Sequence, residues 1–320
     1  MFDAGFNLID LMPNHITGND NPIRGIALAV LATFLFACLN VMTKHISQIY
    51  PVIMILWFRY LLFGAYGLAI GIRKDKKRAF SSIVPALQVT RALLLLAEVG
   101  VYIIAFRHLP LAEISAISGT GPLVTLAMSA VILREVISVR QWLLVAFGFV
   151  GIIIIVKPGF SVFNPYMLIP LFGTLLWGLY QVLTRLVSQY DGAERTTLFT
   201  GTIGFVVLCG FLPFYWMSLD IMWGLKFVVL AVLGVAGHST LIKALSIAPA
   251  SLLQPFSYVS MVWAVAFGWM FFNDIPALTT LVGSGIIILS GTYAFRLKQQ
   301  EAIQDTNLRI FSIKYLIKDS

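Results

Sequence analysis

Three ionisable residues lie well inside long apolar runs of this chain: Arg59, Arg91 and Glu98. A charge near the middle of a bilayer is opposed by about 2.5–3.5 kcal/mol on insertion scales, so such residues usually face a cavity or a partner. Arg59 and Glu98 lie at similar depths if the runs at 50–72 and 84–106 form antiparallel helices. Two interpretations stay open for them: an ion pair that locks two helices, or a site for a substrate or its coupling ion. Arg91 lies within one or two turns of the opposite helix end, where snorkelling of its side chain favours an anchoring role.

Aromatic and amide side chains gather on two further runs. Trp177, Tyr180 and Gln181 share one helical face of the run at 165–187, and Asn40 takes the equivalent place in the run at 23–43. Such a face suits a flat or cationic organic ligand, partly through cation–π attraction. The alternative is that these rings belong to the aromatic belts found at membrane interfaces.

Tyr102 and His238 occupy corresponding positions when the two halves of the chain are aligned. Tyr102 shares a helical face with Glu98, which makes that face the polar side of its helix. His238 could relay a proton near neutral pH. For His238, the alternative is a hydrogen-bonded packing role. Tyr102 and His238 are both candidates for substrate binding or coupling.

Proline stands beside small or polar residues in two runs: Gly119, Gly121 and Pro122 at 111–133, and Gln254, Pro255 and Tyr258 at 250–272. Proline removes a backbone hydrogen bond and frees a carbonyl group. Matched breaks in corresponding positions of two halves point to a transporter binding site. Close packing of helices through small residues would produce a similar pattern.

These residues are embedded in a chain of 320 residues that is 59% hydrophobic and only 11% charged. Soluble domains have about a quarter charged residues, so the composition predicts an all-α polytopic membrane protein. Apolar runs of about 20 residues can each cross a bilayer as a helix. We expect ten such helices, at 23–43, 50–72, 84–106, 111–133, 140–157, 165–187, 196–217, 223–245, 250–272 and 277–296.

The net charge of +8 does not indicate a nucleic-acid partner, because the basic residues lie in short loops between apolar runs. With a cytoplasmic N-terminus, the cytoplasmic loops hold most Lys and Arg residues, including the run at 73–78. Only Lys44, Arg107, Lys157 and Lys226 then fall on the outer side. The positive-inside rule therefore places both termini in the cytoplasm.

Enzymatic motifs are absent from the sequence. It contains no phosphate-binding loop, no His-Glu-x-x-His metal motif and no Gly-x-Ser-x-Gly nucleophile elbow. Cys38 and Cys209 both lie in apolar runs and suggest neither a disulfide framework nor a metal cluster. We therefore predict a protein without catalytic residues, cofactor or metal.

The stretch at 36–48 resembles the stretch at 177–189, which lies 141 positions later. Thr43 then aligns with Thr184, and Lys44 aligns with Arg185. The Arg134-Glu135 and Asn273-Asp274 turns also correspond, so each repeat holds five helices. An odd number of helices forces the second repeat to enter the membrane from the opposite side, and such inverted repeats are typical of secondary transporters. We predict an N-terminal segment at 1–22, repeats at 23–158 and 165–296, and a cytoplasmic tail at 297–320.

Residues 23–296 resemble the ten-helix family of the drug/metabolite transporter superfamily that is built from two EamA domains. The features that carry this resemblance are Lys44, Arg59, the segment at 107–113, Pro122, Arg134-Glu135, Gln141-Trp142, the segment at 177–185 and Gln254-Pro255. The turn Asn273-Asp274 departs from the usual Gly-Glu but keeps the acidic charge. The resemblance implies a carrier in a bacterial-type inner membrane that moves small organic solutes, often amino acids or related metabolites, by alternating access. The second half also resembles carriers proposed for S-adenosylmethionine uptake and for amino-acid export.

The sequence thus predicts a secondary transporter for a small organic solute, such as an amino acid, a related compound or S-adenosylmethionine. Its expected partners are that solute, membrane lipids and a proton or counter-substrate, and Gly-rich faces would allow a homodimer. A channel or lipid scramblase is the principal alternative. A membrane scaffold and an intramembrane enzyme are weaker ones.

Overall fold

The computed structural model describes residues 22–74, 80–132, 138–156, 164–187, 190–247, 253 and 256–318. These residues contain no strand. Their helices are α1 (Pro22–Ser47), α2 (Val52–Lys74), α3 (Pro85–His108), α4 (Leu111–Ser118), α5 (Gly121–Ile132), α6 (Val139–Val156), the short 3₁₀ helix η2 (Pro165–Met167), α7 (Leu168–Val187), α8 (Ala193–Tyr215), α9 (Ile221–Ile247), α11 (Val259–Phe272) and α12 (Leu278–Lys318).

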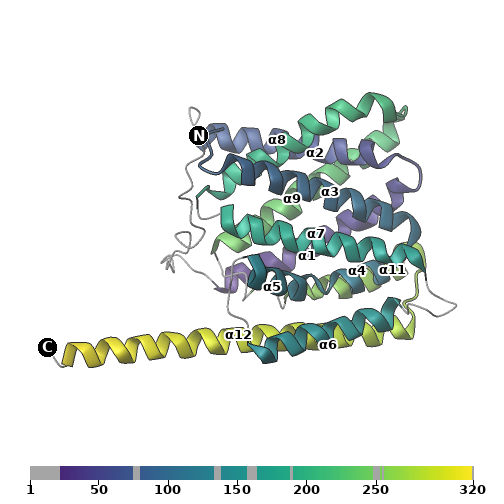
Figure 1. Ribbon diagram of the computed structural model, residues 1–320. Coiled ribbons are helices and arrows are strands. Elements are labelled where there is room, and N and C mark those ends of the chain that lie inside the picture. The colour runs from purple at the N-terminus through teal and green to yellow at the C-terminus, as the bar shows by residue number, and fades with distance from the viewer. Residues whose placement is uncertain are drawn as a thin grey trace.

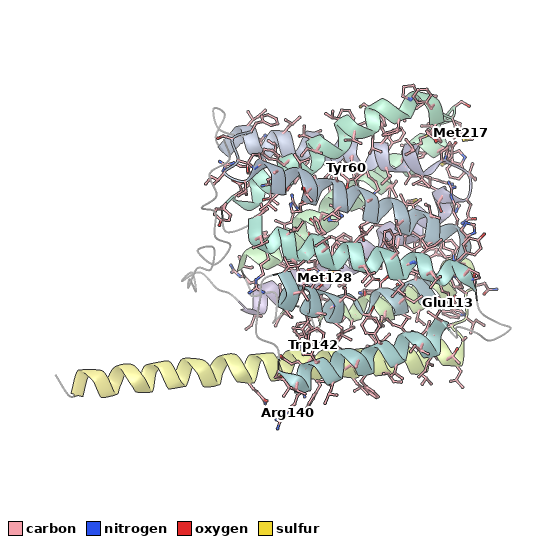
Figure 2. The ribbon with its side chains drawn as sticks, in the orientation of Figure 1. Tyr60, Glu113, Met128, Arg140, Trp142 and Met217 are labelled. Carbon is pink, nitrogen blue, oxygen red and sulfur yellow. The ribbon has the colours of Figure 1, made fainter. Side chains whose placement is uncertain are left out.

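Within this described part of the chain, nine segments are long and apolar enough to cross a membrane, and Val259–Phe272 is a shorter apolar helix. Apolar side chains also cover the outside of the bundle (Figure 2), where Trp142 and Met217 are 43% and 40% exposed. A surface of this kind is suited to lipid rather than water. The prediction of an all-α, multi-pass membrane protein is confirmed.

Helices of the first half pack mainly on helices of the second half (Figure 1). The closest pairs are α2 with α8, α6 with α12, α1 with α9, and α3 with α7. Exchanging the two halves converts the α1–α9 pair into the α7–α3 pair, as expected for repeats related by a pseudo-two-fold axis. The contact between α2 and α8 needs glycine, because a Cβ atom at Gly201 would lie 2.6 Å from the carbonyl oxygen of Phe63.

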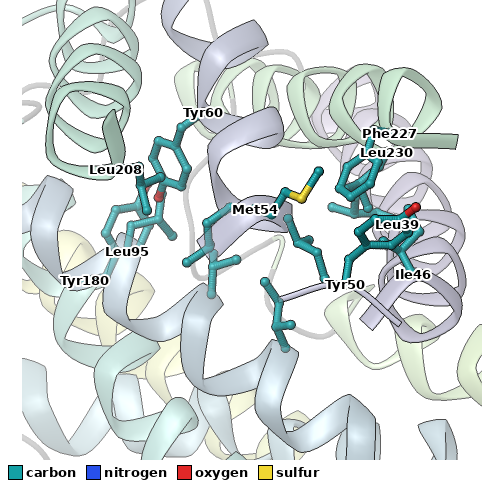
Figure 3. Packing of buried hydrophobic residues seen from close by; sticks show 14 residues of the cluster. Leu39, Ile46, Tyr50, Met54, Tyr60, Leu95, Tyr180, Leu208, Phe227 and Leu230 are labelled. Carbon is teal, nitrogen blue, oxygen red and sulfur yellow. The ribbon is translucent and has the colours of Figure 1, made fainter. Parts of the chain in front are cut away.

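Two clusters of buried apolar side chains form the core. The first joins α1, α2, α3, α7, α8 and α9, and Figure 3 shows Leu39, Tyr50 and Phe227 lying together within it. The second joins α3, α4, α6, α11 and α12.

Two elements differ from the sequence-based expectation. The helix expected at 111–133 is interrupted, since α4 ends at Ser118 and α5 begins at Gly121. The helix expected at 277–296 continues to Lys318 and projects from the bundle (Figure 1). Residues 292–320 contain no Gly or Pro, and many of them are good helix formers, so no local signal ends this helix at the membrane surface.

Candidate binding site

A cavity of about 270 Å³ lies in the middle of the bundle. Side chains from α1, α2, α3, α4, α5, α7, α9 and α11 line it, so both halves of the chain contribute. Ligand pockets in proteins are commonly about 300–1,000 Å³. The cavity lies just below this range, which favours a ligand that is a small organic molecule.

Most of the predicted site residues line this single cavity. They are Asn40, Arg59, Glu98, Tyr102, Gly119, Gly121, Pro122, Trp177, Gln181 and His238. They are drawn from seven helices or helix ends that are distant in the sequence. The sequence identified these residues on separate helices, and the structure shows that they line the same cavity.

Arg59 and Glu98 contribute opposite charges to the cavity. They attract each other electrostatically, but among the described residues no hydrogen bond or ion pair joins them. The direct ion pair considered from the sequence is therefore not formed. Both charged groups keep hydrogen-bonding capacity that a bound molecule could use.

Tyr102 connects three helices at the cavity wall. Its hydroxyl group lies 2.8 Å from Ser118 Oγ and 3.0 Å from Thr174 Oγ1. Ser118 is the last residue of α4, immediately before the interruption at Gly119 and Thr120. Tyr102 thus holds the broken helix against α3 and α7.

Aromatic rings surround the polar groups of the cavity. His238 lies edge-on to Phe36, with ring centroids 5.0 Å apart. Trp177 stacks on Tyr180 at 5.4 Å, and only Trp177 faces the cavity. The arrangement offers a flat apolar wall beside the two charges.

Two predicted contact residues, Tyr180 and Tyr258, do not line the cavity. Tyr180 turns away and accepts a hydrogen bond from Arg91 Nη1 at 3.1 Å. Tyr258 is 5% exposed and packs against α12 beside Gly291. Successive residues of a helix are rotated by about 100° around its axis. Tyr180 and Gln181 therefore lie at opposite edges of the broad face predicted from the sequence, and only Gln181 reaches the cavity. The Tyr258 side chain is directed toward α12 by its packing there, and the sequence contained no signal for that contact.

Gln254 and Pro255, predicted as part of the site, lie outside the described residues, as do Arg134 and Glu135. The neighbouring Leu253, Ser257 and Ser260 line the cavity. Ser257 and Ser260 were not among the predicted site residues. Their spacing of three on a helix could have indicated a shared face.

Arg91 is fully buried, so the expectation that it snorkels to the surface is wrong. Its guanidinium donates to the Thr196 carbonyl oxygen at 2.8 Å, to Gln88 Oε1 at 3.3 Å and also to Thr200 Oγ1. Together with the bond to Tyr180, these contacts link α3, α7 and α8. The missed signal was the spacing of Thr196 and Thr200, four residues apart on a facing helix.

The Arg91 network continues to a buried carboxylate in the α7–α8 connection. Asp191 accepts hydrogen bonds from Gln88 Nε2 at 2.9 Å, Ser82 Oγ at 2.5 Å and Arg195 Nη1 at 2.7 Å. Burial by itself would raise the pKa of Asp191, but these hydrogen bonds and the charge of Arg195 outweigh it and lower the pKa. Asp191 is therefore a charged anchor for this end of the bundle.

Among the described residues, no group of three or more His, Cys, Asp or Glu side chains could hold a metal ion. The cavity groups are instead suited to non-covalent binding of an organic molecule. They comprise a basic side chain, an acidic side chain, amides, hydroxyl groups and aromatic rings.

Residues 23–157 and 164–295 each match the family model described as the EamA-like transporter family. A riboflavin transporter of Brucella anthropi is 26% identical over 280 residues, covering 83% of this chain and 96% of the relative. A pseudopaline exporter of Pseudomonas aeruginosa is 25% identical, covering 83% and 94%. An S-adenosylmethionine uptake transporter of Rickettsia prowazekii is 23% identical, covering 83% and 90%.

One solved crystal structure shares the fold, with a TM-score of 0.59 at 19% identity. The match covers 87% of this chain and 97% of the other.

Proposed function

We propose, from the premise that this chain belongs to the EamA-like transporter family, that it is a secondary transporter for a small charged metabolite. The metabolite would bind in the cavity between the two halves. The halves would then rock about it, so that the cavity opens to one side of the membrane at a time.

The observation that carries this proposal is the cavity itself, with Arg59 and Glu98 both facing it. A desolvated charge in a membrane interior is unfavourable unless it is paired or functional. Among the described residues, neither side chain forms a hydrogen bond or an ion pair, and the two attract each other only through space. A substrate with complementary charges would supply the missing partners.

The charges also suggest the substrate class. Arg59 suits a carboxylate and Glu98 suits an ammonium group, so a zwitterion could satisfy both. Trp177 and Phe36 would then hold the organic body, with Asn40 and Gln181 as hydrogen-bonding groups. An amino acid or a related compound fits this arrangement, and S-adenosylmethionine, the substrate named for one relative, is a specific candidate.

Counterflow in proteoliposomes tests the proposal. Vesicles containing the purified protein are preloaded with pooled unlabelled amino acids or S-adenosylmethionine and then offered trace labelled solute, with and without a pH gradient. Saturable accumulation of one solute is expected, and dependence on the gradient would identify proton coupling. Non-saturable leak without accumulation for any pool would contradict a carrier and favour the channel or scramblase alternative.

We further propose that both termini are cytoplasmic, because that orientation places most basic loop residues on the inner side. The ends of α1 and α3 near Lys44 and Arg107 would then face outward. A membrane-impermeant thiol reagent applied to intact cells should label cysteine placed at Asp220 and leave cysteine placed at Arg24 unlabelled. The opposite pattern would reverse the orientation.

A further inference from the structure

We propose that Lys44 and Asp274 form a latch that closes the cavity at one end of the bundle and must open during transport. This inference rests on the proposed function, because a latch matters only if the cavity opens. It concerns residues that lie outside the cavity lining itself.

The Lys44 ammonium group joins three separate parts of the chain. Its Nζ atom lies 2.7 Å from Asp274 Oδ2 and donates to the Leu109 carbonyl oxygen at 3.2 Å. It also lies 4.7 Å from the centre of the Phe272 ring. One side chain at the end of α1 therefore holds the α3–α4 turn and the α11–α12 turn together.

These contacts lie next to the cavity lining. Phe106 and Leu111, on either side of Leu109 in the chain, both line the cavity, as does Phe267, five residues before the end of α11. Gln48 Nε2 donates to the Phe106 carbonyl oxygen at 3.4 Å. The segments that Lys44 joins are therefore those that cover this end of the cavity.

The latch also crosses the boundary between the two halves. Lys44 and Leu109 belong to the first half, whereas Asp274 belongs to the second. If the halves move against each other, α11 must separate from α1 or from the α3–α4 turn to open this end. Such a movement breaks the ion pair before it disturbs contacts within either half.

The backbone presents Asp274 in a defined position. Asn273 adopts a left-handed conformation, with φ of 57°, and ends α11. The Asp274 amide then donates to the Gly268 carbonyl oxygen at 3.0 Å, which ties the turn to the last residues of α11. The Asp274 and Lys44 side chains are 21% and 12% exposed, so water screens their attraction only in part.

The test measures access to the cavity. Cys38 and Cys209 are replaced by Ala, and Ser115, which lines the cavity, is replaced by Cys. A membrane-impermeant maleimide is then added to one face of the membrane at a time, without substrate. We expect Asp274→Asn and Lys44→Met each to raise the labelling rate from the Lys44 face about tenfold, because the closed state loses an ion pair that joins the two halves.

Asp220→Asn is the matched control. Asp220 precedes α9, where its side chain accepts a hydrogen bond from the Trp223 amide at 2.8 Å, and Asn can replace it in that role. This variant removes one acidic charge outside the cavity and the latch. Its labelling rate should equal that of the protein in which Lys44 and Asp274 are both intact. The exchanged pair, Lys44→Asp with Asp274→Lys, should return the rate toward the original value.

Unchanged labelling in both single variants, each shown to be folded by a monodisperse elution profile, would overturn the latch. The latch would also be overturned if the exchanged pair were labelled as fast as the single variants. Because labelling requires no substrate, it separates the two proposals. Failed counterflow with raised labelling would reject the transporter and keep the latch, and successful counterflow with unchanged labelling would do the reverse.

Discussion

Arg59 and Arg91 are two arginines in neighbouring apolar helices, and their surroundings differ completely. Arg91 has no exposed surface and donates to acceptors on α3, α7 and α8. Arg59 lines the central cavity opposite Glu98. The comparison shows that burial in a membrane helix does not define the role of a charge. What defines it is whether the protein itself supplies the hydrogen-bonding partners.

The Arg91 network is also a continuous chain of polar groups. It runs from Tyr180, beside the cavity wall, through Arg91 and Gln88 to Asp191 at the end of the bundle. Buried hydrogen-bonding networks of this kind rigidify a structure, although the Nε atom of Arg91 has no partner among the described residues. Arg59 faces a cavity in which a ligand could bind to it, whereas Arg91 is hydrogen-bonded within the protein and has a structural role.

The largest expected effect separates the two arginines by transport. Arg59→Met should reduce counterflow about 1,000-fold, equivalent to about 4 kcal/mol of lost binding. Its melting temperature should change little, since Arg59 forms no hydrogen bond that would be lost and only its attraction to Glu98 disappears. Counterflow and thermal melting of the same sample measure both effects. Transport at the original rate would remove Arg59 from the site.

The reciprocal change should act on stability. Arg91→Met should lower the free energy of unfolding by about 3 kcal/mol, because it leaves buried acceptors such as the Thr196 carbonyl without their donor. Thermal melting in detergent or lipid measures the loss, with Arg59→Met as the matched control. A melting temperature equal to that of the control would show that the network contributes little.

A double-mutant cycle sharpens the assignment of Glu98. Because the two side chains attract each other but share no hydrogen bond, Arg59→Met and Glu98→Gln should couple weakly in the free energy of unfolding, by about 1 kcal/mol. If they formed a structural pair, the double variant would be more stable than either single one. Melting of the four proteins distinguishes these outcomes.

The smallest expected effect concerns the far end of the Arg91 network. Asp191→Asn should destabilise the protein by about 1 kcal/mol near neutral pH. The pKa of Asp191 is lowered in the folded state, so its contribution is complete above its unfolded pKa of about 4 and disappears as the pH falls through the folded pKa. Melting from pH 8 to pH 3 should therefore show a constant difference that shrinks only in acid. A difference that grows in acid would contradict the lowered pKa.

Much of the site could be predicted because helical spacing marks polar faces. Asn40, Glu98, Trp177 and Gln181 were identified in this way, and all of them line the cavity. Tyr180 was assigned to the same face as Trp177, yet it belongs to the Arg91 network. Spacing gives the direction of a side chain relative to its own helix, but it does not show which neighbouring helix stands there.

The sequence by itself determined the membrane character, the helical class and the likeness of the two halves. Each of these depends on local composition and on a repeated pattern, both of which can be read along the chain. Only the tertiary structure decided that Arg91 is enclosed, that Arg59 faces a cavity and that Lys44 reaches Asp274. Those outcomes depend on contacts between residues up to 230 positions apart, which no local pattern encodes.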